Sequence, residues 1–178
     1  MDAAAHILET PRVRLREATL ADGPFLLRLL NEPSWRENIG DRGVRSVEDA
    51  ERYIRDRIWS QYEAHGFGMY TVELKSTGRQ IGLCGLVKRE YLSAPDVGFA
   101  LLPEYVGCGY AMEAATRLLA HASNGLGLTR LYAITKPTNA RSMRLLERLG
   151  LHREGPYLTP QGEEVELWIA NCTPSAFT

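Results

Sequence analysis

The stretch Pro103-Glu-Tyr-Val-Gly-Cys-Gly-Tyr-Ala-Met-Glu113 is the strongest fold signal in this chain. It follows the apolar run Asp96–Leu102 and precedes a segment whose apolar residues recur at helical spacing, so a strand is predicted to enter a glycine-bearing loop that opens a helix. Gly107 and Gly109 allow the backbone to approach a ligand closely, and the free N–H groups of a helix start favour an anion. The loop predicts a phosphate site built from backbone, although such turns also use glycine for steric reasons alone.

A second segment with a related order of elements follows. Leu131–Thr135 reads as a strand, and Lys136–Ser142 leads into a short helix whose apolar residues share one face. Gly150 stands where a left-handed residue commonly ends a helix. Asn139 and Ser142 open this helix, where both residue types serve as caps by default. The combined order of strand, glycine loop, long helix, strand, Asn-x-x-Ser and short helix is more specific than either segment alone.

This order resembles the GNAT superfamily of acetyl-CoA-dependent N-acetyltransferases, and within it the RimJ/RimL branch of ribosomal-protein N-terminal acetyltransferases. The resemblance covers nearly the whole chain, from the segment Thr10–Arg16 to about Leu167. The family's pyrophosphate loop, Gln/Arg-x-x-Gly-x-Gly/Ala, appears as Val106-Gly-Cys-Gly-Tyr-Ala111. The family's Asn-x-x-Ser segment with its Leu-Gly-Phe ending appears as Asn139-Ala-Arg-Ser142 and, further on, Leu149-Gly-Leu151.

Two positions depart from the family's pattern. Val106 stands where the loop usually begins with Gln or Arg, so that polar side chain is missing. Leu146 stands seven residues after Asn139, where many superfamily members carry the Tyr that protonates the leaving thiolate. The resemblance to the RimL type then leaves Ser142 as the candidate acid.

The resemblance implies transfer of an acetyl group from the thioester of acetyl-CoA to a primary amine, by direct attack in a ternary complex. The extended pantetheine arm would pair with the open edge of a strand, for which Phe99–Leu101 is the candidate, and a backbone N–H would stabilise the oxyanion. Asn139 is expected to brace this arm. The expected cofactor-binding residues are Phe99, Ala100, Leu101, Val106, Gly107, Cys108, Gly109, Tyr110, Ala111, Met112, Asn139 and Ser142.

The attacking amine must be neutral, so a carboxylate is expected to take its proton, directly or through water. Asp96 opens the strand expected to hold the thioester, and Glu166 lies in the last strand, where RimL-type enzymes carry a carboxylate facing the amine. Each also has an ordinary interpretation, as a turn residue for Asp96 and as a solvent-facing strand residue for Glu166. The candidate catalytic residues are Ser142, Asp96 and Glu166. Candidate walls of the acceptor pocket, whose aromatics also suit a core, are Trp35, Glu37, Asn38, Trp59, Tyr62 and Tyr91.

The resemblance implies an α/β (α+β) fold of the GNAT type, with a mixed, mostly antiparallel sheet of about seven strands in the order β-α-α-β-β-β-α-β-α-β-β. Arg12–Arg16 alternates like a first strand, and Thr19-x-x-Asp22 and Ser46-x-x-Asp49 are predicted helix starts. Asn31–Gly40 interrupts the helical pattern and is expected to be a loop. The remaining predicted strands are 68–74 and 80–87, joined by a hairpin with Gly78 in its turn, and 152–158 and 164–170.

Length and composition favour one enzyme domain spanning residues 1–178, with a core at about 10–170. The net charge of −1, without a basic block, argues against nucleic acid or an anionic membrane as the partner. No apolar run is long enough to span a membrane, and the N-terminal residues lack the basic region of a signal peptide. We expect a monomer or homodimer whose partner is an amine acceptor, which includes a protein N-terminus among its candidates.

Cysteine and histidine usage gives no sign of a metal site. The three cysteines have no paired spacing, which fits a reducing, cytoplasmic location. The four histidines lie far apart and have no partner at ligand spacing. Cys108 lies in the glycine loop, where its backbone N–H is expected to matter more than its sulfur. We therefore expect acetyl-CoA as co-substrate and no metal.

Two other functions stay open. A CoA-binding sensor or interaction module without turnover is compatible with the departures at Val106 and Leu146, and an assay with acetyl-CoA and amines would separate it from an enzyme. An enzyme that binds a nucleotide phosphate is disfavoured because the loop lacks both the Gly-Lys-Ser/Thr ending and the Gly-x-Gly-x-x-Gly fingerprint. The sequence does not distinguish a protein N-terminus from an amino-acid-like metabolite, a polyamine or an antibiotic as the acceptor.

Overall fold

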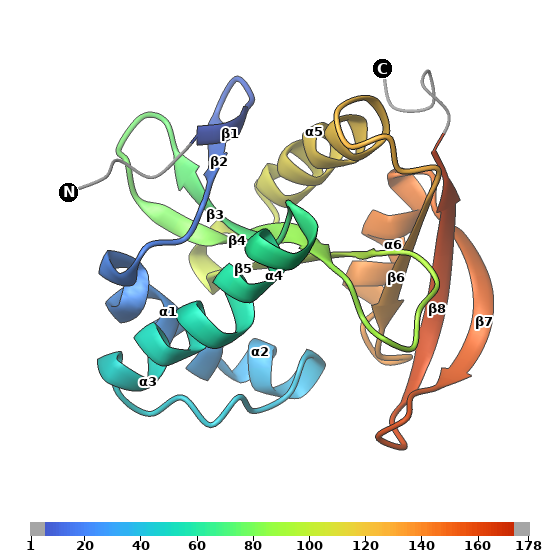
Figure 1. Ribbon diagram of the computed structural model, residues 1–178, viewed down its shortest axis with the longest axis horizontal. Coiled ribbons are helices and arrows are strands. Elements are labelled where there is room, and N and C mark those ends of the chain that lie inside the picture. The colour runs from blue at the N-terminus through green and yellow to red at the C-terminus, as the bar shows by residue number, and fades with distance from the viewer. Residues whose placement is uncertain (1–5, 173–178) are drawn as a thin grey trace.

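The computed structural model, which describes residues 6–172, consists of an eight-stranded mixed sheet with helices on both faces (Figure 1). The strand order is β1-β2-β3-β4-β5-β6-β8-β7. Every neighbouring pair is antiparallel except β5 and β6, which are parallel. The strands are β1 His6–Glu9, β2 Val13–Arg16, β3 Met69–Leu74, β4 Gln80–Val87, β5 Asp96–Leu101, β6 Arg130–Thr135, β7 His152–Leu158 and β8 Glu164–Asn171.

The helices divide into two groups along the chain. The first group precedes β3 and covers the face of the sheet turned toward the viewer in Figure 1, whereas α5 and α6 lie on the other face. The helices are α1 Gly23–Asn31, α2 Pro33–Asn38, α3 Val47–Tyr53, the π-helical segment η2 Ile54–Trp59, α4 Ser60–His65, α5 Tyr110–Asn124 and α6 Ala140–Arg148, with short 3-10 turns η1 Leu20–Asp22 and η3 Pro103–Tyr105.

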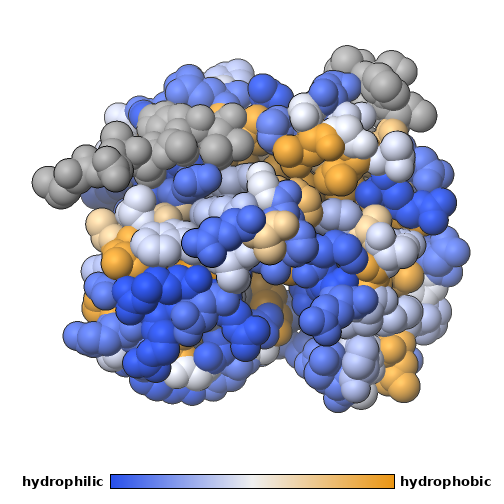
Figure 2. All heavy atoms as spheres, in the orientation of Figure 1, coloured by the Kyte–Doolittle hydropathy of each residue, from blue (hydrophilic) through white to orange (hydrophobic). Residues whose placement is uncertain are grey.

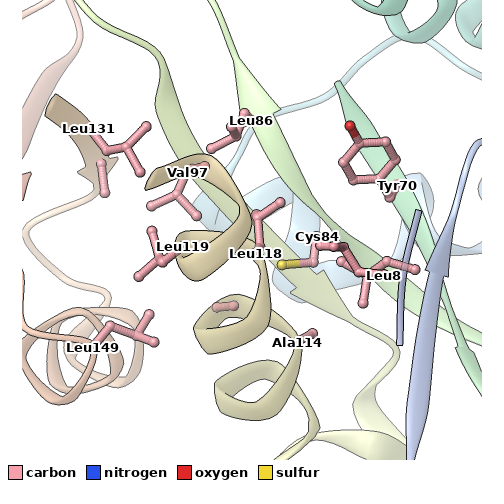
Figure 3. Close-up of a cluster of buried hydrophobic side chains, with 14 of the residues drawn as sticks. Leu8, Tyr70, Cys84, Leu86, Val97, Ala114, Leu118, Leu119, Leu131 and Leu149 are labelled. Atoms are coloured by element: carbon pink, nitrogen blue, oxygen red, sulfur yellow. The ribbon is translucent and has the colours of Figure 1, made fainter. Parts of the chain in front are cut away.

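Each face of the sheet carries its own apolar core. On the α5 face, Leu118 and Leu119 pack with Cys84, Leu86 and Val97 of the sheet (Figure 3). On the α1–α4 face, the buried residues are Ala18, Leu26, Leu29, Leu30, Trp35, Val44, Ala50, Ile54, Ile58, Leu83 and Leu102. Both cores enclose the middle of the sheet, so β4 and β5 are held from two sides.

Strand β5 illustrates how alternation serves both cores. Val97, Phe99 and Leu101 belong to the α5 side, whereas Ala100 packs with the α1–α4 side. Successive side chains of a strand point to opposite faces, so Asp96 and Gly98 share the direction of Ala100. The backbone of β5 is therefore fixed in the middle of the molecule, next to the parallel strand β6.

The N-terminal third contains one strand more than predicted and corrects one predicted loop. His6–Glu9 forms an edge strand that pairs with β2, so the sheet, predicted to have about seven strands, has eight. The segment 31–40 is not wholly a loop, because Pro33–Asn38 forms helix α2 with Pro33 in its first turn. A four-residue strand is too short to show a period, and proline at the first turn favours a helix rather than breaking it.

Most of the other predicted elements were confirmed. Ser46 caps α3 through a hydrogen bond from the Asp49 N–H, and the Asp22 carboxylate accepts the Thr19 N–H at 2.8 Å. Gly78 and Gly150 adopt left-handed conformations, with φ of 69° and 85°, in the β3–β4 turn and after α6. The sequence did not show that the second long helix contains a π-helical turn between α3 and α4.

Candidate active site

The parallel strands β5 and β6 separate beside the glycine loop. They pair at a single position, Asp96 with Tyr132, and the Tyr132 N–H donates to the Pro95 carbonyl at 2.9 Å. Within residues 6–172, the rest of β5 has no strand partner on this edge, so peptide groups of Phe99–Leu101 face the gap. Figure 2 shows a hollow on the front of the molecule, between the surface over α1–α3 and the surface over β6–β8. The sheet thus opens at the strand predicted to hold a thioester.

The glycine loop connects η3 to α5 at the end of β5. Gly107 and Gly109 both have φ of 85°, and Gly109 is the N-cap residue of α5. The carbonyl of Gly109 accepts the Glu113 N–H at 3.0 Å, which begins the helical ladder and leaves the first-turn N–H groups without helical partners. The loop therefore presents backbone donors at the positive end of a long helix, which is an arrangement that binds phosphate.

Arg12 lies against this loop, although it is distant in sequence. Its guanidinium donates to a Glu113 carboxylate oxygen at 2.7 Å and to the Cys108 carbonyl at 3.1 Å, and it lies over the Tyr110 ring at 4.6 Å from the ring centre. A Cβ atom built on Gly109 would lie 3.2 Å from Arg12 Nη2. The Arg12 guanidinium therefore lies beside the space that the missing side chain of Gly109 leaves open. The contact of Arg12 with the glycine loop was not predicted, because the sequence suggested only a strand at Arg12–Arg16.

The start of α6 brings Asn139 and Ser142 together. Asn139 is the N-cap residue, and its Oδ1 accepts the Ser142 backbone N–H at 3.1 Å. The Ser142 hydroxyl and the Asn139 side-chain nitrogen make no hydrogen bond with any residue in 6–172 and are half-buried. Leu146, at the position of the expected Tyr, is buried in the core beneath the helix. Asn139 therefore has a structural role as a cap, and both residues retain polar groups for a ligand.

Asp96 is buried at the start of β5 and is 3% exposed. Arg89, in the β4–β5 loop, donates from Nε to Asp96 Oδ1 at 2.9 Å. Burial raises the pKa of Asp96, and the Arg89 charge opposes that rise. This carboxylate consequently binds a proton more readily than an ordinary surface aspartate.

Glu166 has the opposite electrostatic setting. Arg153, on the neighbouring strand β7, donates two hydrogen bonds to its carboxylate at 2.7 and 2.8 Å. These hydrogen bonds hold the pKa of Glu166 below its usual range. Glu166 is only 5% exposed, so it is not the solvent-facing strand residue of the ordinary interpretation.

The structure does not bring Asp96 and Glu166 together. Glu166 shares its strand parity with Trp168 and Ala170, which belong to the α5–α6 core. Asp96 shares its parity with Ala100, which packs toward α1–α4. The two candidate bases therefore lie on opposite faces of the sheet.

Three predicted wall residues serve mainly as framework. Trp35 is buried in the front core, Trp59 donates its indole N–H to the Ala18 carbonyl at 2.7 Å, and the Tyr62 hydroxyl accepts the Ala18 N–H at 3.2 Å. The polar groups of Trp59 and Tyr62 are thus committed to holding the front helices in place. The indole N–H of Trp35 is buried and has no hydrogen-bond partner among residues 6–172.

The remaining wall residues lie in helix α2 and in the β4–β5 loop, on either side of the hollow. Tyr91 stacks on Tyr157 of β7 with ring centres 6.1 Å apart. Lys136, after β6, donates to the Glu37 carbonyl of α2 at 2.6 Å. These contacts join the two halves of the molecule on either side of the gap, and Asn38 lies half-buried at the end of the same helix α2.

The described residues 6–172 contain no cluster of three His, Cys, Asp or Glu side chains that suits a metal ion. Cys84 and Cys172 are buried, and burial raises the pKa of Cys84 to about 12. Cys108 is exposed in the glycine loop. In the same range, no helix combines the length and apolar character needed to cross a bilayer.

A strand edge opened beside a glycine-capped helix start suits the extended arm and the phosphates of a CoA thioester, as an acyltransferase requires. Residues 12–152 match the family model described as "Acetyltransferase (GNAT) domain". The chain belongs to the GNAT acetyltransferase family, and it is an acetyl-CoA-dependent N-acetyltransferase. The expected fold class was therefore confirmed.

Similar proteins agree with this assignment. The uncharacterized N-acetyltransferase YoaA of Bacillus subtilis (strain 168) is 27% identical over 151 residues, which cover 84% of each chain. An acetyltransferase from Agrobacterium tumefaciens str. C58 superposes with a TM-score of 0.80 at 24% identity, covering 96% of this chain and 97% of that one. RimL, a ribosomal alpha-N-protein acetyltransferase in complex with coenzyme A, has a TM-score of 0.83 at 17% identity, covering 96% of this chain and all of its own. The two structural likenesses show the shared fold.

Proposed function

We propose that this enzyme belongs to the RimJ/RimL-like branch and acetylates a primary amine by direct attack within a ternary complex. The observation that carries the proposal is the free edge of β5 beside the glycine-capped start of α5. Acetyl-CoA supplies the activated acyl group as a thioester. The sequence resemblance and the likeness to RimL support the branch, and a protein N-terminus is the acceptor that this branch suggests.

The backbone of Val106–Met112 is the proposed pyrophosphate site, and the edge of Phe99–Leu101 is the proposed pantetheine site. The residues fit this group, because both loop glycines are left-handed and the first N–H groups of α5 lack helical partners. Arg12 is proposed to supply the side-chain charge that the family loop takes from its first residue, here Val106. A side chain from the turn between β1 and β2 would thus replace one from the loop.

Ser142 is the proposed acid that protonates the departing thiolate, directly or through water. Its hydroxyl is free within the described chain, whereas its backbone N–H holds the helix cap. Asn139 is proposed to brace the cofactor arm through its side-chain nitrogen, because its oxygen is engaged in the cap. One helix start would then hold the arm and donate the proton.

Asp96 is the preferred base for the proton of the amine. It lies on the α1–α4 side of β5, its pKa is raised by burial, and β5 is the strand proposed to hold the thioester. Glu166 is the weaker candidate, because Arg153 occupies its carboxylate and lowers its pKa. A water molecule would complete the relay in either case.

A turnover assay with acetyl-CoA tests the proposal. The purified protein should release free CoA thiol when a peptide with a free N-terminus is present, and calorimetry should detect CoA binding in its absence. Mass spectrometry should locate the acetyl group on the amine. CoA binding without turnover on peptides, amino acids, polyamines and aminoglycosides would favour the alternative of a CoA-binding sensor.

A further inference from the structure

A pocket opens on the front helices, between the loop that precedes α3 and the helix α3–η2 itself. We call it the arginine pocket, and it shares no residue with the proposed cofactor site. It is lined by Arg42, Gly43, Val44, Asp49, Arg52, Tyr53, Asp56 and Arg57.

The charges in the arginine pocket do not cancel. Asp49 accepts the Arg45 N–H at 3.0 Å and pairs with Arg52 at 3.2 Å, so this acid and this base offset each other. Arg42 and Arg57 make no hydrogen bond or ion pair with any residue in the described range 6–172. Asp56 is the one further acid in the lining, which leaves an excess of positive charge.

Tyr53 adds an unused donor to the two guanidinium groups. Its hydroxyl makes no hydrogen bond within the described chain, and the side chain is partly buried. Burial raises the pKa of Tyr53, whereas the charges of Arg42, Arg57 and Arg89 lower it. The pocket lining places the Tyr53 side chain together with Arg42 and Arg57.

Arg89 connects this pocket to the proposed reaction centre. It pairs with Asp96 at the start of β5, the strand proposed to hold the thioester. The charge of Arg89 lowers the pKa of Tyr53 as well as that of Asp96, the preferred base. The surface over α1–α3 that contains the pocket also borders the hollow in Figure 2.

We propose that the arginine pocket binds an anionic group, a carboxylate or a phosphate, carried by the acceptor of the acetyl group. Arg42 and Arg57 offer unpaired guanidinium donors, and Tyr53 offers a hydroxyl, which together match the acceptor oxygens of such a group. The inference rests on the proposed function and adds the class of acceptor, an amine with a negative charge on the same molecule. Its amino group would approach Asp96 while its anionic group lies in the pocket.

The test compares the parent enzyme with the double variant Arg42→Gln/Arg57→Gln. Arg55→Gln is the matched control, because Arg55 is also exposed on η2 and pairs with Glu51 at 3.9 Å, outside the pocket lining. Small acceptors are β-alanine, phosphoethanolamine and the neutral β-alaninamide. Peptide acceptors are alanyl-glutamate amide and alanyl-glutamine amide, which separate a peptide carboxylate from a metabolite.

The parent should prefer the anionic member of at least one matched set, measured as kcat/KM from thiol release. The double variant should lose this preference by roughly tenfold, as expected for partly exposed charge-assisted hydrogen bonds. Arg55→Gln should keep the parent's preference. An equal preference in the parent and the double variant would overturn the proposal.

A second measurement does not depend on acetyl transfer. Inorganic phosphate is titrated while the arginine Nε–H resonances are followed by NMR. Shifts of Arg42 and Arg57 that saturate in the parent and persist in Arg55→Gln support the pocket, whereas their absence from the parent overturns it. A parent that binds phosphate here but acetylates no amine would count against the proposed function and leave the anion site standing.

Discussion

Single residues of the proposed cofactor site combine a structural contact with a group left for the proposed ligand. Arg12 is the clearest example, because Nε pairs with Glu113 and Nη1 with the Cys108 carbonyl, while Nη2 borders Gly109. Ser142 is similar, with its backbone in the cap and its hydroxyl unused. Substitutions at these positions can therefore separate support of the fold from contact with the cofactor.

Arg12→Gln should weaken CoA binding by roughly tenfold, the order expected for one partly exposed charge-assisted hydrogen bond. Since the lost contact is electrostatic, the variant should also respond less to added salt. Arg12→Lys should recover part of the affinity, because it keeps the charge without the forked geometry. Calorimetry at two salt concentrations measures both effects. An unchanged affinity in Arg12→Gln would limit Arg12 to bracing the loop.

Ser142→Ala should lower turnover by about 10²-fold, the low end for losing one general acid. CoA affinity and thermal stability should stay near the parent's, because the backbone N–H still bonds to Asn139. Asn139→Ala is the contrasting variant, and losing the cap should destabilise the protein by about 1 kcal/mol. Steady-state kinetics and thermal unfolding of both variants give the comparison. Parent-like turnover in Ser142→Ala would show that water alone protonates the thiolate.

At the scale of elements, the glycine loop depends on a backbone conformation that other residues rarely adopt. Gly109→Val should lose CoA binding, because its side chain would enter the space between the loop and Arg12 Nη2. It should also lose about 1–2 kcal/mol of stability, since φ is 85° at this residue. Gly150→Val is the control, with the same φ and open space around its Cβ. Calorimetry should show CoA affinity retained in Gly150→Val, and equal losses in both variants would contradict the phosphate site.

The elements themselves were largely predictable from local sequence, and the exceptions have physical causes. The long helices and central strands follow from apolar periodicity and from caps such as Ser46. β1 is held by backbone pairing with β2. Its four residues are too few to show the alternation of apolar and polar side chains that identifies a strand. α2 begins at a proline, and no local motif in the sequence marks the π-helical turn η2.

At the scale of the whole molecule, more residues of the proposed cofactor site than of the proposed acceptor site could be named from the sequence. The glycine loop and the Asn139–Ser142 cap are local motifs, so their residues could be named from sequence. The contact between Arg12 and the glycine loop joins distant segments and is visible only after folding. The arginine pocket is formed by the short stretch 42–57, but its unpaired groups also become visible only in the folded chain. The face of the sheet on which Asp96 or Glu166 lies likewise depends on which core each strand's alternate side chains join, and this is known only from the fold.

This division of faces leads to a prediction about the base. The acidic limb of the pH profile of kcat/KM should disappear in Asp96→Asn and persist in Glu166→Gln, because Asp96 lies on the α1–α4 side of the sheet, which carries the proposed acceptor pocket. Burial raises the pKa of Asp96, so the limb of the parent should lie above the usual aspartate range. Arg89 opposes that rise, so Arg89→Gln should move the limb to still higher pH. A limb retained in Asp96→Asn, with circular dichroism showing a folded protein, would reject Asp96 as the base.

Glu166 should instead appear in the pH dependence of stability. Arg153 lowers its pKa in the folded state, so its ion pair stabilises the protein above the unfolded-state pKa of a glutamate. That contribution is lost as the pH falls through the folded-state pKa. Glu166→Gln should therefore be less stable than the parent at neutral pH, and the difference should shrink in acid. Urea unfolding at several pH values measures this, and a pH-independent difference would show that Glu166 contributes no ionised pair, because only the charged carboxylate is linked to proton binding in this range.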